Sequence, residues 1–147
     1  RPWLLGDRRG PGVDEVIDRI RAAVASYPYA NVYHIWPGPN SNTFTAHVLR
    51  AVPELRVTLP ANAIGKDYLG SRVIAKTPSG TGGQINLFGL AGLLAGWEEG
   101  IEINLIGLTF GVSPKHLALK LPMIGDFGAG GPVMPQALEP PMDSDAD

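Results

Sequence analysis

The chain has 147 residues, of which 44% are apolar, and this length and composition suit one domain with its own hydrophobic core. Its net charge of −2 at pH 7 gives none of the basic footprint of a nucleic-acid-binding protein, so no nucleic-acid partner is expected. The absence of cysteine excludes disulfides, thiolate metal sites and a cysteine nucleophile.

The first predicted element is an amphipathic helix. Apolar residues recur at helical spacing on one face, at Val13, Ile17, Ile20 and Val24, until Pro28 ends the pattern. The chain opens with an arginine and no apolar signal core follows, so we expect it to be the C-terminal part of a longer protein.

A rigid turn rich in proline and glycine follows, and the rest of the chain is organised around it. Residues 29–36 are β-branched and aromatic, which predicts a short strand or an extended arm that leads into the turn. Residues 36–44 read WPGPNSNTF, and the two prolines exclude a helix through the turn itself. A second helix therefore begins after Pro39, is capped by one of residues 40–42, and runs to Pro53.

The elements after the second helix are short. Apolar and polar residues alternate over residues 55–59, which predicts a half-buried strand. Residues 61–69 are interpreted as a loop or a single helical turn. Residues 77–83, TPSGTGG, have turn composition, with a phosphate-binding nest of N–H groups as the less favoured alternative.

A β-hairpin is predicted for the apolar, glycine-spaced second half. Residues 85–97 carry no charge but are too few for a membrane-spanning helix, which needs about 20 residues. They form one arm, and the alternating residues 101–105 form the other. The glycines are expected to mark bends in a curved sheet. Residues 117–121 alternate again and predict a further strand.

These elements together predict an α+β fold, with two amphipathic helices packed on an antiparallel, glycine-rich sheet. We place a single domain at residues 1–125. Residues 126–147 form a Gly/Pro-rich acidic tail with few core-forming residues, which is expected to be disordered or draped over a partner.

Ser41 is a candidate nucleophile, because backbone N–H groups at a helix N-terminus can stabilise an oxyanion intermediate. Its base would be a histidine. His34 lies on the incoming arm and can fold back across the turn, whereas His47 lies on the far side of the helix and His116 lies near the last predicted strand, distant in sequence. The predicted catalytic pair is therefore Ser41 and His34. The G-x-S-x-G pattern is absent, and the alternative is that Ser41 or Asn40 only caps the helix.

Other polar residues are candidates for binding. Asn40 and Asn42 flank Ser41 and could donate to an oxyanion, while Lys66, Asp67 and Tyr68 form either a polar site or an exposed turn. The histidines are isolated, and neither the P-loop nor the dinucleotide-binding glycine pattern is met. No metal and no cofactor are therefore expected.

Four blocks of sequence carry a resemblance to a known family, namely WPGPNSNTF, LPANAIGKDYLG (59–70), TPSGTGG and EEGIEINLIGLTFGV (98–112). In this order they resemble the bacterial domain of unknown function 3750, from about Tyr27 to Gly125. The resemblance implies a longer protein in which a His-Thr-Trp block and a hydrophobic N-terminal stretch come first. The family has no established activity.

Residues 40–44, NSNTF, are also similar to the Asn-Cys-x-x-Phe block of circularly permuted papain-like domains of the NlpC and lecithin-retinol-acyltransferase type. The resemblance implies a permuted papain-like fold that lacks its N-terminal part, with Ser41 in place of the nucleophilic cysteine. A hydroxyl is a far poorer nucleophile than a thiolate without a nearby base, and the family's histidine is expected in the missing segment. The chain would then be half of an active site, or a hydrolase relic.

Two functions stay open, and with them the question whether the protein is an enzyme. The first is a non-catalytic binding or accessory subunit of a bacterial cell-envelope assembly. Its partner would be another protein or an upstream fragment of the same protein, with peripheral membrane association as a further option. The second is a serine-dependent acyl hydrolase or amidase. The first is favoured because no activating base can be located, and it predicts an apolar surface patch on residues 85–110.

Overall fold

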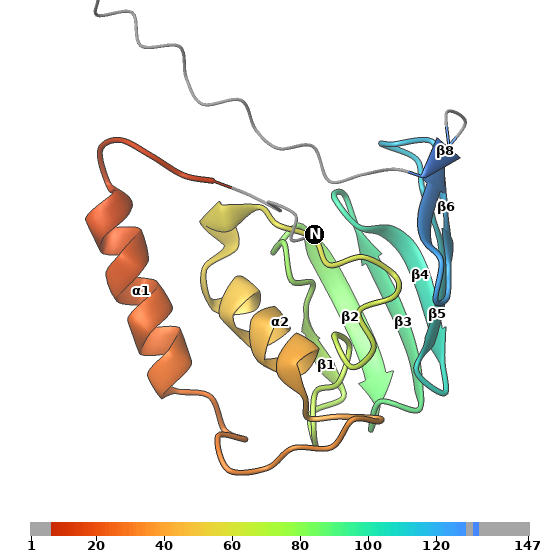
Figure 1. The fold of residues 1–147 in the computed structure, drawn as a ribbon, viewed down its shortest axis with the longest axis horizontal. Coiled ribbons are helices and arrows are strands. Elements are labelled where there is room, and N and C mark those ends of the chain that lie inside the picture. The colour runs from red at the N-terminus through yellow and green to blue at the C-terminus, as the bar shows by residue number, and fades with distance from the viewer. Residues whose placement is uncertain (1–6, 129–130, 133–147) are drawn as a thin grey trace, which may run out of the picture.

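The computed structural model describes residues 7–128 and 131–132, and within them the helices come first and one sheet follows (Figure 1). The elements are α1 (Val13–Ala25), α2 (Ser41–Ala51), the 3₁₀ helix η1 (Pro53–Leu55), β1 (Ile74–Lys76), β2 (Gly82–Leu87), β3 (Ala91–Gly96), β4 (Gly100–Leu105), β5 (Leu108–Ser113), β6 (Ala118–Leu121), β7 (Gly125–Gly128) and β8 (Gly131–Pro132). The predicted α+β class is confirmed.

The sheet is an antiparallel meander in which the strands pair in the order β1 to β8. The predicted hairpin is present as β3 and β4, but its first arm, residues 85–97, is broken into β2 and β3 at residues 88–90. Gly89 and Gly107 lie in turns with a φ of 78° each, a backbone region that glycine occupies without steric cost. The glycines at these two positions therefore mark bends, as expected.

The first core cluster joins the two helices. Val16 and Ala23 of α1 pack against Val52, at the end of α2. The predicted face is correct at Ile20, which packs against this cluster, but Ile17 and Val24 are 37% and 46% exposed, and the residue before each is buried instead. Figure 1 places α2 between α1 and the sheet.

The second core cluster lies on the other side of α2, where Ala46 and Leu49 pack against Leu59. The strand predicted for residues 55–59 is wrong: η1 ends at Leu55, and no strand follows before β1. The apolar residues of this segment fill the space beside α2, so packing against the helix replaces strand pairing.

The segment before α2 forms no strand either; residues 28–31 form a turn and residues 35–40 a series of bends. The backbone N–H of His34 donates to the carbonyl of Pro39 at 2.8 Å and closes a loop. The indole Nε1 of Trp36 donates to the carbonyl of Ile106, in the β4–β5 turn, at 3.0 Å. The proline-rich turn is therefore attached to one end of the sheet.

The sheet continues past the predicted domain boundary at residue 125. Residues 126–128 belong to β7, which pairs with β6, and residues 131–132 form β8, so these positions are not a disordered tail. Residues 133–147 of the predicted tail lie outside the described part of the chain.

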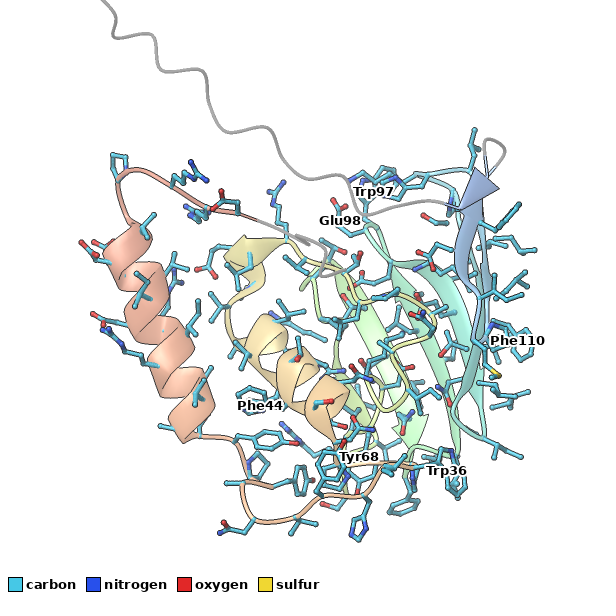
Figure 2. All side chains as sticks on the ribbon, in the orientation of Figure 1. Trp36, Phe44, Tyr68, Trp97, Glu98 and Phe110 are labelled. Atoms are coloured by element: carbon cyan, nitrogen blue, oxygen red, sulfur yellow. The ribbon has the colours of Figure 1, made fainter. Side chains whose placement is uncertain are left out.

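The two faces of the sheet differ sharply in composition. The inner face, which looks towards α2, carries Gln84, Glu102 and Lys120, and all three are buried. The outer face carries a row of paired residues across β2 to β5, namely Ile85, Leu93, Ile103 and Phe110. Figure 2 shows Phe110 pointing away from the helices. The polar face of the sheet is therefore covered by α2, and the apolar face is exposed.

Candidate functional site

Asn40 holds the start of α2 and connects it to two loops. Its Oδ1 accepts hydrogen bonds from the backbone N–H groups of Asn42 and Thr43 at 3.0 and 3.1 Å. Its Nδ2 donates to the carbonyls of Ile35 and Ile64. Asn42 also donates to the carbonyl of Ile64, at 2.8 Å. One residue of the 40–42 triplet does cap the helix, as predicted, and that residue is Asn40.

Ser41, the candidate nucleophile, is exposed and lines a cavity of about 570 Å³ together with Tyr27 and Phe44. His34 is exposed as well, and its ring does not line this cavity. Within residues 7–128, the histidine ring bonds involve His47, and none reaches Ser41. The structure thus places Ser41 in a cavity without placing a base beside it.

His47 connects the two helices. Its Nε2 lies 3.0 Å from the carbonyl oxygen of Ala23 and 3.2 Å from the hydroxyl of Ser26, both at the end of α1. Burial lowers the pKa of His47 below 6.5; the bond to Ala23 opposes this shift, and the charges of Arg72 and Arg50 add to it. His47 is therefore favoured as a neutral ring that bonds the neighbouring helix.

Lys66 and Asp67 are 2% and 5% exposed, which excludes the exposed turn of the two predicted alternatives. The ammonium of Lys66 donates to the carboxylate of Glu102 and, at 3.2 Å, to Oδ1 of Asp67. Asn104 donates to the other oxygen of Asp67 at 3.1 Å. The loop before β1 is thus fixed to the inner face of β4.

Lys120 completes a buried ion cluster, defined here as Lys66, Asp67, Glu102 and Lys120. It donates to Glu102 from β6, across the intervening strand β5. Gly111 of β5 lies in register between them. A Cβ atom on Gly111 would stand 2.5 Å from the carbonyl oxygen of Ile101 and 3.0 Å from Cγ of Glu102, so the glycine leaves room for the pair.

The four charges of the ion cluster balance, with two lysines against two carboxylates, and a third carboxylate, Asp126, lies 3.9 Å from the ammonium of Lys120 at the edge of the cluster. Desolvation is the largest effect on the pKa of Lys66 and lowers it, but the attraction and hydrogen bonds of Asp67 and Glu102 outweigh it. The pKa of Lys66 is therefore raised, and the ammonium stays charged at neutral pH. Each ion is neutralised inside the cluster, which gives it a structural character.

Tyr68 does not join this cluster, although it follows Asp67 in the chain. Its ring lies edge-on to Tyr29, with the ring centroids 5.9 Å apart, and it lines a different cavity beside α2. Figure 2 shows Tyr68 at the same end of the sheet as Trp36. The three predicted binding residues 66–68 are therefore divided between a closed cluster and an open cavity.

The Ser79–Gly83 loop holds a carboxylate of the protein itself. Glu99 is 2% exposed and accepts hydrogen bonds from the backbone N–H and the hydroxyl of Ser79, both at 2.8 Å, and from the hydroxyl of Thr81 at 3.2 Å. The donors weighed as a phosphate nest are thus used by Glu99, which agrees with the favoured interpretation as a turn.

The outer face is the largest unexplained feature of the surface. Its central side chains are each about half exposed: Ile85 49%, Leu93 48%, Ile103 49% and Phe110 45%. The apolar row beside them contains Ile101, Val112, Leu119 and Phe127. From β2 to β7 every outward strand position is apolar or glycine. Soluble monomers rarely expose so continuous an apolar surface, which marks interaction sites.

Sequence reasoning missed Glu99, Glu102 and Lys120 as buried groups. In the strands, Glu102 and Lys120 alternate with apolar residues, and such a pattern ordinarily predicts that the charged residue faces water. The sequence does show that the strand positions that alternate with these charged residues carry no charge. This pattern indicates that the two faces of the sheet differ, but not which face is covered.

Two kinds of site are absent from the described part of the chain. No group of three or more His, Cys, Asp or Glu side chains there is arranged to hold a metal ion. No helix among the same residues is long and apolar enough to cross a membrane.

Comparison with known proteins gives one match. No curated protein and no solved structure matches the chain. Residues 1–68 match the model of a family described as "Protein of unknown function (DUF3750)". The match includes the WPGPNSNTF block and the stretch up to Tyr68, whereas the two later blocks lie beyond it. Over its first 68 residues, the chain therefore resembles the DUF3750 family, as its sequence blocks indicated.

Proposed function

We propose that this protein is a non-catalytic binding module, an accessory subunit of a bacterial cell-envelope assembly, which docks onto a protein partner through the outer face of its sheet. The observation that carries the proposal is the uncharged row of Ile85, Leu93, Ile103 and Phe110, each about half exposed. A sheet buries its apolar face against another layer, and here the helices cover only the polar face.

The expected partner is a protein surface that is itself apolar and uncharged. Six strands at a spacing of about 4.8 Å, with a rise of about 3.3 Å per residue, give β2–β7 a plan area on the order of 500 Å². Side chains that project from the sheet, and the apolar turns at Phe88, Ile106 and Met123, add to this area. The total approaches the roughly 800 Å² that each partner contributes to a stable interface. Apolar composition of this kind is typical of obligate interfaces.

A protein partner suits this face better than lipid does. The sheet is open, and β1 pairs with β2 alone among the described strands. The unpaired backbone groups of an open edge are costly within the hydrocarbon of a bilayer, whereas a protein can cover or pair them. The support for the cell-envelope location is the hydrophobic N-terminal stretch that the family resemblance implies ahead of the residues seen here.

The hydrolase alternative has less support. Ser41 is exposed in a cavity at a helix N-terminus, but a serine needs a base, and no histidine contacts it within residues 7–128. We expect a fluorophosphonate probe to leave Ser41 unlabelled. Labelling that disappears in Ser41→Ala would revive the enzyme hypothesis.

The proposal can be tested with a charge placed in the centre of the outer face. The tagged full chain is expressed in its source bacterium as wild type, as Ile103→Glu, and as His116→Glu, which adds the same residue at an exposed turn. Native mass spectrometry of the purified material should show a stoichiometric protein partner with the wild type and His116→Glu, and none with Ile103→Glu.

Two further measurements test whether a second copy of the chain, or lipid, covers the outer face instead of a protein partner. Gel filtration with light scattering detects a second copy of the chain, and flotation with phosphatidylethanolamine/phosphatidylglycerol vesicles detects lipid. A partner retained equally by wild type and Ile103→Glu, or a wild type that travels alone, would contradict the proposal. Circular dichroism confirms that each variant is folded.

A further inference from the structure

A second cavity, independent of the outer face, lies between the C-terminal half of α2 and the loops that follow α1 and precede β1. Its volume is about 230 Å³. His47 and Arg50 reach it from α2, Tyr29 from the loop after α1, and Tyr68 and Arg72 from the loop before β1. Three segments that are distant in sequence thus bring two guanidinium groups together with the phenol rings of three tyrosines, Tyr29, Tyr68 and Tyr27.

The lining of this cavity is cationic. It contains two arginines and a histidine but no Asp or Glu. Arg50 donates only to neutral acceptors, namely the carbonyls of Lys76 and Lys66 at 3.1 and 2.9 Å and Oε1 of Gln84 at 2.6 Å. Among the described residues no ion pair involves Arg50 or Arg72.

No carboxylate of the described residues forms an ion pair with Arg50. Asp67 is bonded to Lys66 and Asn104 within the ion cluster. Burial lowers the pKa of Arg50 to about 10; the charges of Asp67 and Glu99 act in the opposite direction, and the positive charge of Arg72 lowers the pKa further. Arg50 remains protonated at neutral pH, so two positive charges face the same cavity, and a bound anion would relieve their repulsion.

We propose that this cavity binds a small organic anion through a carboxylate or phosphate group held by Arg50 and Arg72. The guanidinium of Arg72 offers paired N–H donors that match the two oxygens of such a group, and Arg50, whose Nε and Nη2 are already bonded within the protein, can add its Nη1. The rings of Tyr29 and Tyr68 form an aromatic wall for the rest of the ligand. The volume lies below the roughly 300–1,000 Å³ of pockets for drug-sized molecules, which restricts the ligand to a small one.

A structural role alone explains Arg50 but not Arg72. Arg50 joins α2 to the loop and to β1 and β2 through its three hydrogen bonds, so its removal would disturb folding as well as binding. Arg72 is exposed and makes no side-chain hydrogen bond within residues 7–128, yet it lines the same cavity. Arg72 is therefore the position at which binding can be weakened without damage to the fold.

The test is calorimetric titration of the full chain with inorganic phosphate and with benzoate, at low ionic strength. The variants are Arg72→Ala and, as a matched control, Arg21→Ala, an exposed arginine of α1 outside this cavity. We expect saturable binding of at least one anion by the wild type. Arg72→Ala should weaken it about tenfold, as the loss of a hydrogen bond to a charged group does, with no effect of Arg21→Ala.

Matched thermal unfolding of wild type and Arg72→Ala, without added anion, shows that the variant keeps its fold. Binding that depends on Arg72 as described supports the site. The absence of saturable binding of both anions, or equal weakening by Arg72→Ala and Arg21→Ala, would overturn it. Both results are independent of whether a protein covers the outer face.

Discussion

Glu102 and Lys120 meet across an intervening strand, because Gly111 has no side chain to separate them. Both are almost fully buried, and Lys66 provides a second cation for the same carboxylate. Oppositely charged side chains therefore fill the layer between α2 and the sheet. A small domain usually places apolar side chains in such a layer. The stability of this layer depends on each of the charged residues, since a buried charge without its partner is costly.

The first prediction concerns the carboxylate shared by the two lysines. Glu102→Gln leaves Lys66 and Lys120 with an uncompensated charge, and we expect it to lower the free energy of unfolding by about 3–5 kcal/mol. Glu98→Gln is the matched control, because Glu98 pairs with Lys115 at the surface, where ion pairs contribute about 0–1 kcal/mol. Urea unfolding at pH 7 measures both; equal losses would contradict the role of the cluster.

The second prediction concerns the space between Glu102 and Lys120. Gly111→Ala places a methyl group 2.5 Å from a backbone oxygen that cannot move freely, so we expect a loss of about 1–3 kcal/mol. Gly83→Ala, on the outer face of β2, meets its nearest atom at 3.9 Å and should cause no loss. Thermal unfolding compares the two, and a Gly111→Ala protein as stable as Gly83→Ala would refute the steric argument.

The third prediction separates the two roles of Asn40. Asn40→Ala removes the helix cap and the bonds to two loop carbonyls, and should cost about 1 kcal/mol for the cap and a similar amount for the loops. Asn40→Asp keeps the cap acceptor but not the Nδ2 donor, so its stability should lie between those of Asn40→Ala and the wild type. The midpoints of urea unfolding rank the stabilities of the three proteins. An Asp variant as unstable as the Ala variant would show that the cap contributes little.

The fourth prediction concerns acid pH. The pKa of His47 is lower in the folded state than 6.5, so the unfolded chain takes up the proton first as pH falls. His47 therefore contributes no loss of stability above pH 6.5 and a growing loss below it. Uptake of one proton can lower the free energy of unfolding by at most about 1.4 kcal/mol per pH unit. The loss due to His47 should stay below this limit, because the ring is partly solvated.

Melting temperatures above and below pH 6.5 measure this effect. His47→Gln can still donate to the carbonyl of Ala23 and should flatten the pH dependence, while His116→Gln, at an exposed turn, should keep it. An unchanged pH dependence in His47→Gln would assign acid sensitivity to other groups.

Local chemistry in the sequence predicted several elements correctly. The start of α2 follows from Pro39 and the cap at Asn40, and β4 and β6 follow from alternation, because these signals depend on neighbouring residues alone. The strand expected at residues 55–59 failed because Leu59 packs against Ala46 and Leu49, and a tertiary contact of this kind overrides an alternating pattern.

The sequence by itself determined that residues 101–105 and 117–121 form strands with one apolar and one polar side, since successive side chains of a strand point to opposite faces. Only the tertiary structure decided which side is covered. The loop at Lys66 and Asp67 pairs with Glu102 and Asn104, and this draws the polar side under α2 and leaves Ile103 and its neighbours outside. A strand pattern is equally compatible with either orientation, and contacts between residues distant in the chain select one of them.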